Sequence, residues 1–577
     1  MKRLLYAAFV ALVISGCTGH RPHTVILELA ATSDVHGNCF PFDFTVEAGT
    51  PADGSLARVA PRVRELRKEF GERLLCFDIG DMLQGSPLTY QDKTADFSGV
   101  SVCASVMNDI GYDAVTIGNH DLESGMPTLD KHIRSCGFPL LCANLFYGDT
   151  QQTWLDPYCI IERDGVRIAV VGMSTPYASF KIPPSNIEGY RFRGIEETAA
   201  KLIPYIQENE HPDLIVGLFH SGLDGGKIDG SLYENETMTT AVNVPGFDII
   251  FYGHDHIASC RKIENCAGDS VLLINPGPYA ACMALVDVEV DIAADTVSQI
   301  RINGHLEDVC GVEPDAKMLD GYSGKIESVW QYQDSVVGSV GVCLDTHEAL
   351  FGQSGVTDFF NTLLLAMNGN EICISSPYSC DLKIAAGDVK LGEVWKLYPY
   401  ENCASSMWMR GSELVDVLEY FSGRWVNTIS TAADTLLKVV ETNGVTVPEN
   451  RVFDFMTAGG VNYTIDVTKP VGERVRILSM ADGTPFDETR YYRTGISSFL
   501  SCGGYSPFNE AIGLTGEELR EREIISTMAD FRYHIITRLS LDRESHRTTA
   551  VKRIGSWKFI PEDMAAAAFR LTPLRTE

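Results

Sequence analysis

Five short apolar segments of this chain are each followed directly by a small cluster of Asp, His or Asn residues. The apolar segments are 25–31, 74–78, 113–117, 213–219 and 247–252, and they are rich in β-branched and aromatic residues. Such segments are typical of buried strands. Further strands are expected at 166–172 and 271–274, and helical segments such as 56–69 and 122–135 lie between them. Strands that alternate with helices predict a layered α/β domain.

The polar clusters after these strands should meet at one place. Ligand sites in α/β sheets lie at the carboxyl ends of the strands. The clusters span residues 32–37, 80–88, 118–121, 220–222 and 253–256. Their candidate site residues are Asp34, His36, Asp81, Asn119, His120, His220, His254 and His256.

Imidazoles together with carboxylates favour Zn, Mn, Fe or Co over an all-oxygen calcium site. In Asp34-x-His36 and His254-x-His256, both side chains share one face if the segment stays extended. A carboxylate such as that of Asp81 can bridge two cations ~3.5–4 Å apart, and such a pair stabilises both oxygens of a phosphoryl displacement. A lone Asp-x-His or His-x-His is more often an ordinary polar pair, and Gly118-Asn119-His120-Asp121 alone is a stronger signal. Five such motifs in this order predict a dinuclear metal centre.

Length and charge limit the possible organisation and partners. A chain of 577 residues exceeds the ~250–300 residues of a single core. Its net charge of −30 argues against a nucleic-acid polymer as partner, because binding one requires a basic surface. A small anionic substrate remains compatible if bound cations create a local positive site.

The N-terminus predicts export. Lys2 and Arg3 precede an apolar run at 4–14, which is too short to span a bilayer. The sequence Ile14-Ser15-Gly16-Cys17 resembles a bacterial lipobox, which implies a signal peptide over residues 1–17 and lipidation of Cys17; a plain secretory signal is the alternative. We expect a periplasmic or cell-surface protein whose only membrane contact is this lipid anchor.

The second half of the chain has a different pattern. A polar amphipathic stretch predicts a linker helix at 316–340, between a domain at 24–315 and a mixed α+β domain at 341–545. Within the latter, 460–466 and 475–480 are expected to pair as strands. Residues 546–577 carry no interpretable pattern and are treated as a tail. Cys260 and Cys266 are spaced for a local disulfide, although buried free thiols are slightly favoured.

The order of motifs DVHG, GD, GNHD, HSG and GHDH resembles the calcineurin-like metallophosphoesterases, and the two-domain layout resembles the 5′-nucleotidase family within them. This resemblance implies a layered α/β metallophosphoesterase domain followed by a mixed α+β 5′-nucleotidase C-terminal domain. It also implies two divalent metal ions. One would be held by Asp34, His36, Asp81 and His256, and the other by Asp81, Asn119, His220 and His254.

The resemblance implies that His120 is an uncoordinated catalytic histidine that stabilises the phosphate and protonates the leaving oxygen. Family members commonly place Asp or Asn three residues later to orient this histidine, whereas this chain has Glu123. Asp121 is the alternative partner.

In the family's C-terminal domain two aromatic side chains sandwich the nucleobase, and the matching positions here are Phe453 and Phe499. Ordinary core packing is the alternative for both. The family's GGDGY loop is shortened to Gly503-Gly504-Tyr505, so its Asp has no clear counterpart.

The segments 80–88 and 460–466 are more similar to the 2′,3′-cyclic-nucleotide 2′-phosphodiesterase/3′-nucleotidase branch than to the 5′-nucleotidase branch. The resemblance therefore implies a metal-dependent hydrolase of nucleotides. A 5′-nucleotidase or UDP-sugar hydrolase is the enzymatic alternative. A surface lipoprotein that only binds nucleotide or metal is the non-catalytic one.

Overall fold

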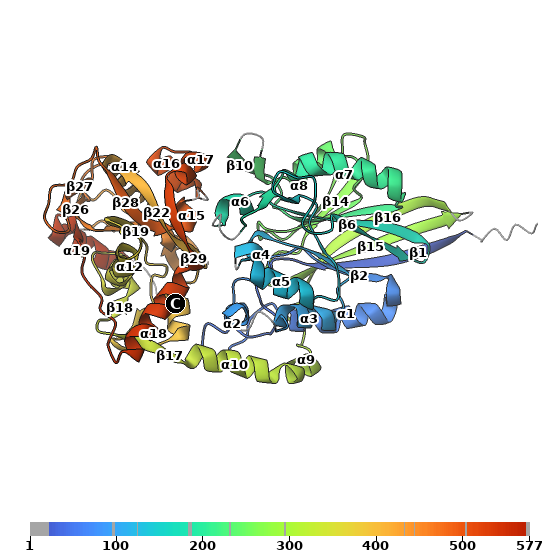
Figure 1. Cartoon of the computed structure of the whole chain (residues 1–577), viewed down its shortest axis with the longest axis horizontal. Helices are drawn as coiled ribbons and strands as arrows, with labels where there is room; N and C mark the ends of the chain where they lie inside the picture. Colours follow the sequence, from blue (N-terminus) through green and yellow to red (C-terminus); the bar gives the residue numbers. More distant parts are fainter. Residues whose placement is uncertain are drawn as a thin grey trace, which may run out of the picture.

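The computed structural model describes residues 22–572 except 95–98, 124, 183–186, 230–231, 294–295, 432, 443–444, 502 and 504. The predicted signal peptide with Cys17, and Gly504, therefore lie outside the described residues. Figure 1 shows two lobes, one coloured blue to yellow-green and the other yellow to red. Helix α10 (Ser323–Asp334) runs along the lower edge and joins them.

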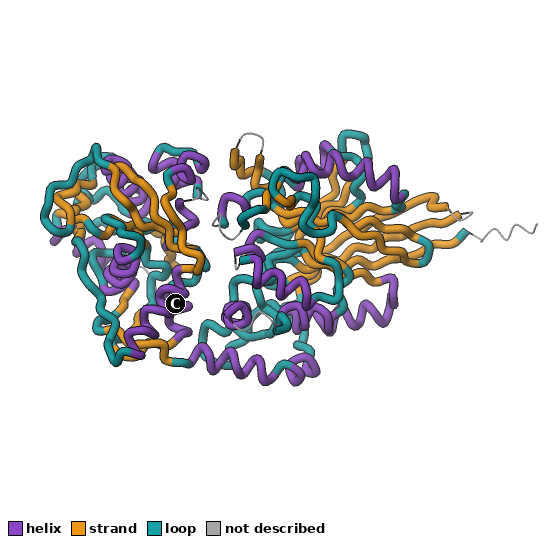
Figure 2. The backbone as a smooth tube through the Cα atoms, viewed as in Figure 1, coloured by secondary structure: helices purple, strands orange, loops and turns teal. Residues whose placement is uncertain are grey.

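The N-terminal domain is built on two six-stranded sheets (Figure 2). The first has the order β16-β15-β1-β2-β3-β4, with the bounds β16 (Thr296–Asp308), β15 (Cys282–Ala293), β1 (His23–Thr32), β2 (Leu74–Asp78), β3 (Ala114–Thr116) and β4 (Leu140–Leu141). The second has the order β13-β14-β12-β9-β7-β6, with the bounds β13 (Ser259–Glu264), β14 (Ser270–Asn275), β12 (Ile249–Tyr252), β9 (Leu214–His220), β7 (Val166–Ser174) and β6 (Tyr158–Arg163).

The two sheets pack face to face, and helices cover their outer faces. The core between them includes Leu29 of β1, Phe77 of β2 and Leu218 of β9, all fully buried. Helices α1 (Leu56–Phe70) and α3 (Val102–Ile110) pack on the first sheet. Helices α7 (Ile195–Glu210) and α8 (Thr237–Asn243) pack on the second. The layered α/β prediction is confirmed, as four layers.

All seven strands that the sequence predicts for this domain are present, but one predicted helix is wrong. The segment 122–135 is not continuous, because it contains the end of α4 (Asn119–Glu123) and all of α5 (Met126–Ser135). Gly125 between them has φ 81°, which a continuing helix does not allow. Pro127 lies in the first turn of α5, where its missing N–H removes no helical hydrogen bond.

The C-terminal domain contains a five-stranded sheet in the order β25-β19-β28-β22-β29. Its strands are β25 (Thr457–Gly459), β19 (Ile372–Ser375), β28 (Tyr491–Ser497), β22 (Cys403–Arg410) and β29 (Glu523–Asp530). The predicted strand pair is confirmed as β26 (Val461–Asp466) and β27 (Val475–Met480), which are antiparallel.

The division of the chain after residue 315 differs from the sequence-based one. The expected linker helix at 316–340 consists of α9 (Ala316–Gly321), α10 and the strand β17 (Val336–Val340). The tail assignment for 546–577 is wrong for the residues described there. Strand β30 (Ser556–Ile560) pairs in parallel with β26, and Trp557 stacks on Tyr463 with only 10° between the ring planes. Burial of Trp557 and Phe559 explains why this segment belongs to the domain.

The structure also bears on Cys260 and Cys266 and on possible membrane-spanning helices. Cys260 and Cys266 are free and exposed, so they form neither a local disulfide nor buried thiols. Over the part of the chain that the structure describes, none of the helices combines the length and apolar character needed to cross a membrane.

Candidate metal centre and interdomain cleft

The structure brings the polar clusters together at one edge of the N-terminal domain, which we call the metal edge. Asp34 and His36 follow β1, and Asp81 follows β2. Asn119 begins α4 after β3, His220 ends β9, and His254 and His256 follow β12. The metal edge is thus formed by both sheets, whose strands end side by side.

Five of these residues have a left-handed backbone. The φ angles are 49° at Asp34, 51° at His36, 59° at Asp81, 77° at His254 and 59° at His256. The extended conformation assumed for the two i, i+2 motifs is therefore wrong. Left-handed non-glycine residues cost ~1–3 kcal/mol each and persist where surrounding contacts impose them, often at functional sites.

The first ligand group is Asp34, His36 and His256, whose ligand atoms lie within 4.8 Å of one another. Nε2 of His36 is 3.2 Å from Nε2 of His256, which in turn is 3.4 Å from Oδ1 of Asp34. Nδ1 of His36 lies 2.9 Å from the Gln84 carbonyl, so it must donate, and Nε2 carries the lone pair. Burial lowers the pKa of His36 to about 4, so the ring is neutral at pH 7 and suited to bind a cation.

The second group is Asp81, His220 and His254, again within 4.8 Å of one another. Nδ1 of His220 donates to the Ile79 carbonyl at 2.7 Å. Its Nε2 lies 3.0 Å from Oδ2 of Asp81 and 3.2 Å from Oδ1 of Asn119. Burial opposes charging of His220, but Asp81 outweighs it and raises the pKa to about 10. The oxygen atoms around His220 therefore favour a positive charge at this position, which a proton or a metal ion can supply.

The carboxylates of both groups are ionised. Burial alone would raise the pKa of Asp81, but the imidazoles of His220 and His120 outweigh burial and hold it well below its usual range. In the same way burial of Asp34 is outweighed by His256 and His220, and its pKa is about 2. Both side chains are essentially inaccessible to solvent.

The ligand geometry fits divalent cations. Zn–N bonds of about 2.0–2.1 Å place neighbouring tetrahedral ligands roughly 3.3 Å apart. The 3.0–3.4 Å separations within the two groups and between His220 and Asn119 match this value. Buried nitrogen and oxygen atoms that face one another at such distances need a proton or a metal ion between them. The donor set of imidazole, carboxylate and amide oxygen suits a transition metal.

Of the two carboxylates considered as the partner of His120, only that of Glu123 contacts the imidazole. Oε2 of Glu123 lies 2.8 Å from Nδ1 of His120. Asp121 is instead the acceptor for four backbone N–H groups, of Gly118, Asp81, Met82 and Leu83, at 2.8–2.9 Å. Asp121 therefore holds the Asp81 loop in place, and Glu123 is the side chain in contact with His120.

A cavity of about 520 Å³ extends from the metal edge to the C-terminal domain. We call it the interdomain cleft. On the side of the metal edge it is lined by His36, Gln84, His120, Glu123, His256 and Tyr279, and on the other by residues that include Ser376, Tyr400, Arg451, Phe453 and Phe499.

Phe453 and Phe499 both line the cleft, but they do not form a sandwich in this structure. Their ring centroids are 6.4 Å apart and the planes are at 89°. A base between two parallel rings needs roughly 7 Å, twice the ~3.5 Å contact distance. Tyr505 lies at only 33° to Phe499 with a centroid distance of 5.6 Å, and its hydroxyl donates to Asp454. One of the phenyl rings must rotate before a base can lie between them.

Several residues at the site have no signal in the sequence. Glu234, on β11 (Leu232–Asn235), holds Nε2 of His254 at 2.9 Å and leaves the other ring nitrogen for a metal. Arg451 is the one arginine or lysine among the described residues that line the cleft. Gln84 lies in the cluster at 80–88, but only the fold shows that its carbonyl orients His36.

The layered fold, the two ligand groups and the cleft define a metallophosphoesterase. Family models support this class on both domains: residues 27–258 match the calcineurin-like phosphoesterase model and residues 336–510 match the 5′-nucleotidase C-terminal domain model. The chain belongs to the calcineurin-like phosphoesterases that carry a 5′-nucleotidase C-terminal domain. This fold implies divalent metal ions.

Relatives are distant but cover most of the chain. The trifunctional nucleotide phosphoesterase protein YfkN of Bacillus subtilis is 25% identical over 83% of this chain, which corresponds to 36% of that longer protein. A 2′,3′-cyclic-nucleotide 2′-phosphodiesterase/3′-nucleotidase of Salmonella typhimurium is 23% identical over 83% of this chain and 82% of its own length. A 5′-nucleotidase of Vibrio cholerae is 24% identical over 86% and 93%.

Among solved structures, a Staphylococcus aureus protein classed as a 5′-nucleotidase superposes with a TM-score of 0.71. The superposition covers 92% of this chain and 99% of that one at 20% identity. At this identity the likeness supports the two-domain fold alone.

Gly253→Ala should weaken metal binding while the chain stays folded. Gly253 precedes His254, and a Cβ there would collide with Ser33 Oγ and lie 2.6 Å from Oδ2 of Asp34. The Asp34 carboxylate must then move, and displaced support of a ligand typically costs 10–100-fold in metal affinity. Metal content by elemental analysis and affinity by calorimetry measure the effect.

Gly311→Ala is the matched control, because nothing lies within 4 Å of its Cβ position and its backbone is not left-handed. It should keep full metal affinity. Unchanged affinity in Gly253→Ala, with an unchanged thermal midpoint, would show that Asp34 does not hold a metal.

Proposed function

We propose that this chain hydrolyses phosphoesters of nucleotides in the interdomain cleft. The observation that carries the proposal is that one cavity is lined by His36, His120 and His256 at one end and by Phe453 and Phe499 at the other. A nucleotide has the same two ends, an anionic phosphate and a flat base. The N-terminal domain would act on the phosphate while the C-terminal domain binds the base.

Asp34, His36, Asp81 and His256 would hold one divalent cation, and Asp81, Asn119, His220 and His254 would hold the other. Their identity is Zn, Mn, Fe or Co. Two such ions, when bound, lower the pKa of a coordinated water and offset negative charge on the reacting phosphate. In a protein of net charge −30 this local positive charge is what admits an anionic substrate.

His120 would act as the general acid toward the leaving oxygen. Glu123 holds its Nδ1 at 2.8 Å, so only Nε2 can exchange a proton with substrate. Glu123 replaces the Asp or Asn that is common in the family, and its longer side chain still contacts the ring. Helix α4 places residues 120 and 123 on the same face.

On the opposite wall Phe453 and Phe499 would stack on the base. Arg451 would add positive charge near them, with its guanidinium carbon 6.0 Å from the Phe453 ring centroid. The oxygens of the neighbouring Asp454 are occupied by Tyr505 and Arg424, which leaves Arg451 available to a substrate oxygen.

Within the family we favour a 2′,3′-cyclic-nucleotide 2′-phosphodiesterase/3′-nucleotidase. The segments 80–88 and 460–466 support this branch, and a relative of that name aligns over most of both chains. The alternative, a 5′-nucleotidase or UDP-sugar hydrolase, has a relative of comparable similarity. A protein that only binds nucleotide or metal would have no use for His120 and Glu123.

A substrate panel tests the proposal. We use the chain from residue 18, loaded with Mn²⁺ or Zn²⁺. It should open the cyclic phosphate of 2′,3′-cyclic AMP and release phosphate from 3′-AMP. Both reactions should be faster than hydrolysis of 5′-AMP or UDP-glucose. A chelator should abolish turnover, and the metal should restore it. A preference for 5′-AMP or UDP-glucose would assign the other branch. Nucleotide binding without turnover on any substrate would support the binding protein.

Phe499→Ala should impair nucleotides more than an aryl phosphate. Stacking on one aromatic ring is worth ~1–3 kcal/mol per base, so KM for a nucleotide should rise roughly five- to hundredfold. An aryl phosphate lacks the base and should keep its kcat/KM. Phe569→Ala, a partly buried phenylalanine that does not line the cleft, is the control. Equal losses on both substrates would make Phe499 a core residue.

We also propose that the protein is exported and lipid-anchored at Cys17. The basic residues at 2–3, the apolar run at 4–14 and the lipobox-like residues that end at Cys17 support this location. The full-length chain should incorporate labelled palmitate and sediment with membranes, whereas Cys17→Ser should do neither. Unlabelled, soluble wild-type protein would leave a plain secretory signal as the explanation.

A further inference from the structure

Helix α2 (Pro87–Thr94) belongs to the N-terminal domain by sequence but is packed into the C-terminal domain. Tyr90 on this helix is 1% exposed and is part of an apolar cluster otherwise formed by the C-terminal domain. Its ring meets Trp395 of α13 (Leu391–Leu397) edge to face, with a centroid distance of 5.3 Å. Gln91 donates to Ser328 of α10 at 3.0 Å. The helix therefore contacts both the linker and the C-terminal domain.

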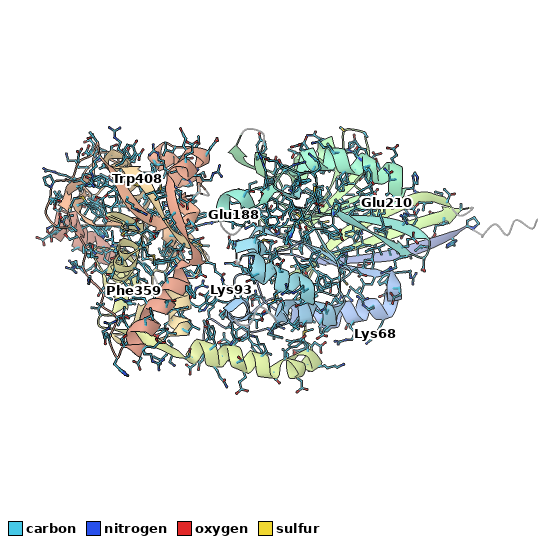
Figure 3. The ribbon with its side chains drawn as sticks, in the orientation of Figure 1. Lys68, Lys93, Glu188, Glu210, Phe359 and Trp408 are labelled. Carbon is cyan, nitrogen blue, oxygen red and sulfur yellow. The ribbon has the colours of Figure 1, made fainter. Side chains whose placement is uncertain are left out.

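Lys93, one turn further along α2, places a positive charge at this interface. Its Nζ lies 2.5 Å from Oε2 of Glu401 and 3.4 Å from Oδ2 of Asp530, and it also lies 4.5 Å above the Tyr90 ring. The side chain is only 13% exposed, and both carboxylates are nearly buried. Figure 3 shows Lys93 at the boundary between the two lobes.

A second cation of the C-terminal domain completes this cluster. Arg532 lies 3.5 Å above the Trp395 ring, and its Nη1 is 3.5 Å from Oε1 of Glu401. It also donates from Nε to the Tyr398 carbonyl at 2.9 Å and from Nη2 to the Tyr400 carbonyl at 3.2 Å. Two buried cations therefore balance two buried carboxylates.

The cluster holds the segment that forms one wall of the cleft. Residues 399–402 line the cleft, and Arg532 and Lys93 hold this segment through the Tyr400 carbonyl and the Glu401 side chain. At its other end α2 begins three residues after Gln84, whose carbonyl orients His36. The short helix thus connects a metal-edge histidine with the wall of the cleft that faces it.

We propose that Lys93 is a positioning residue, which sets the separation between the metal edge and the cleft wall formed by residues 399–402. This proposal rests on the proposed function, because the separation matters for a substrate that must reach both ends of the cleft. Without Lys93, Arg532 is the one cation left in this cluster against two buried carboxylates, of Glu401 and Asp530. Removal of one partner from a buried ion pair leaves an uncompensated charge, which the protein relieves by moving it toward water. The wall carrying Tyr400 then shifts away from the metal edge.

Lys93→Met tests this, because it keeps the aliphatic length and removes the charge. In the metal-loaded chain we expect KM for the preferred nucleotide to rise at least about tenfold, since misplacement of ~1 Å can cost 10²-fold. The kcat on an aryl phosphate, which contacts only the metal edge, should stay within about twofold of wild type, and metal content should not change. Lys93→Arg, which keeps the charge, should recover most of the nucleotide KM.

Lys68→Met is the matched control, since Lys68 is exposed on α1, away from the C-terminal domain in Figure 3. Small-angle scattering gives a readout that does not depend on turnover: Lys93→Met should have a larger radius of gyration than wild type and Lys68→Met should not. Unchanged nucleotide KM and unchanged radius of gyration in Lys93→Met would overturn the proposal. So would equal losses on nucleotide and aryl phosphate with both metals retained, because Lys93 would then only stabilise the fold. Absence of turnover in the metal-loaded wild type would instead refute the proposed function, and the scattering comparison alone would then decide the role of Lys93.

Discussion

The contact between the Asp81 carboxylate and the His220 imidazole is the interaction on which the rest of the site depends. Asp81 follows β2 of the first sheet and His220 ends β9 of the second, so the 3.0 Å contact joins the two sheets at the metal edge. Both side chains are inaccessible to solvent, and such groups are stable only when charge and hydrogen bonds are fully matched. Asp121, with four backbone N–H donors, holds the Asp81 loop in the conformation that this contact requires.

The other requirement is that two domains present their side chains to one cavity. The N-terminal domain supplies the candidate metal ligands and His120, and the C-terminal domain supplies aromatic rings and Arg451. Neither half of the cleft resembles a complete site by itself. Helix α10 and helix α2 connect the halves, and the buried charges around Lys93 favour one relative placement over others because any shift would expose them or leave them unpaired.

Much of the fold was predictable from the chain, for identifiable reasons. The seven buried strands were found because each is a short β-branched run ended by polar residues, a pattern set by local burial. The helix at 122–135 was mispredicted because apolar periodicity continues across Gly125, whose left-handed backbone interrupts it. The segment after 545 was missed because Trp557 and Phe559 lie on a strand that is recognisable only from its pairing with β26, almost a hundred residues earlier.

The sequence by itself determined the types of residue at the metal edge, because the His, Asp and Asn residues that can bind divalent metal ions directly follow predicted strands, in an order that is visible along the chain. It also determined the α/β character of the first domain through the alternation of strands and helices. Tertiary structure alone decided that Glu123 contacts His120, that Glu234 holds His254, and that Phe453 and Phe499 stand perpendicular across the cleft. It likewise decided that Lys93 contacts a loop some three hundred residues later. These contacts join residues distant in sequence, or depend on side-chain rotamers, and no local pattern of the chain encodes either.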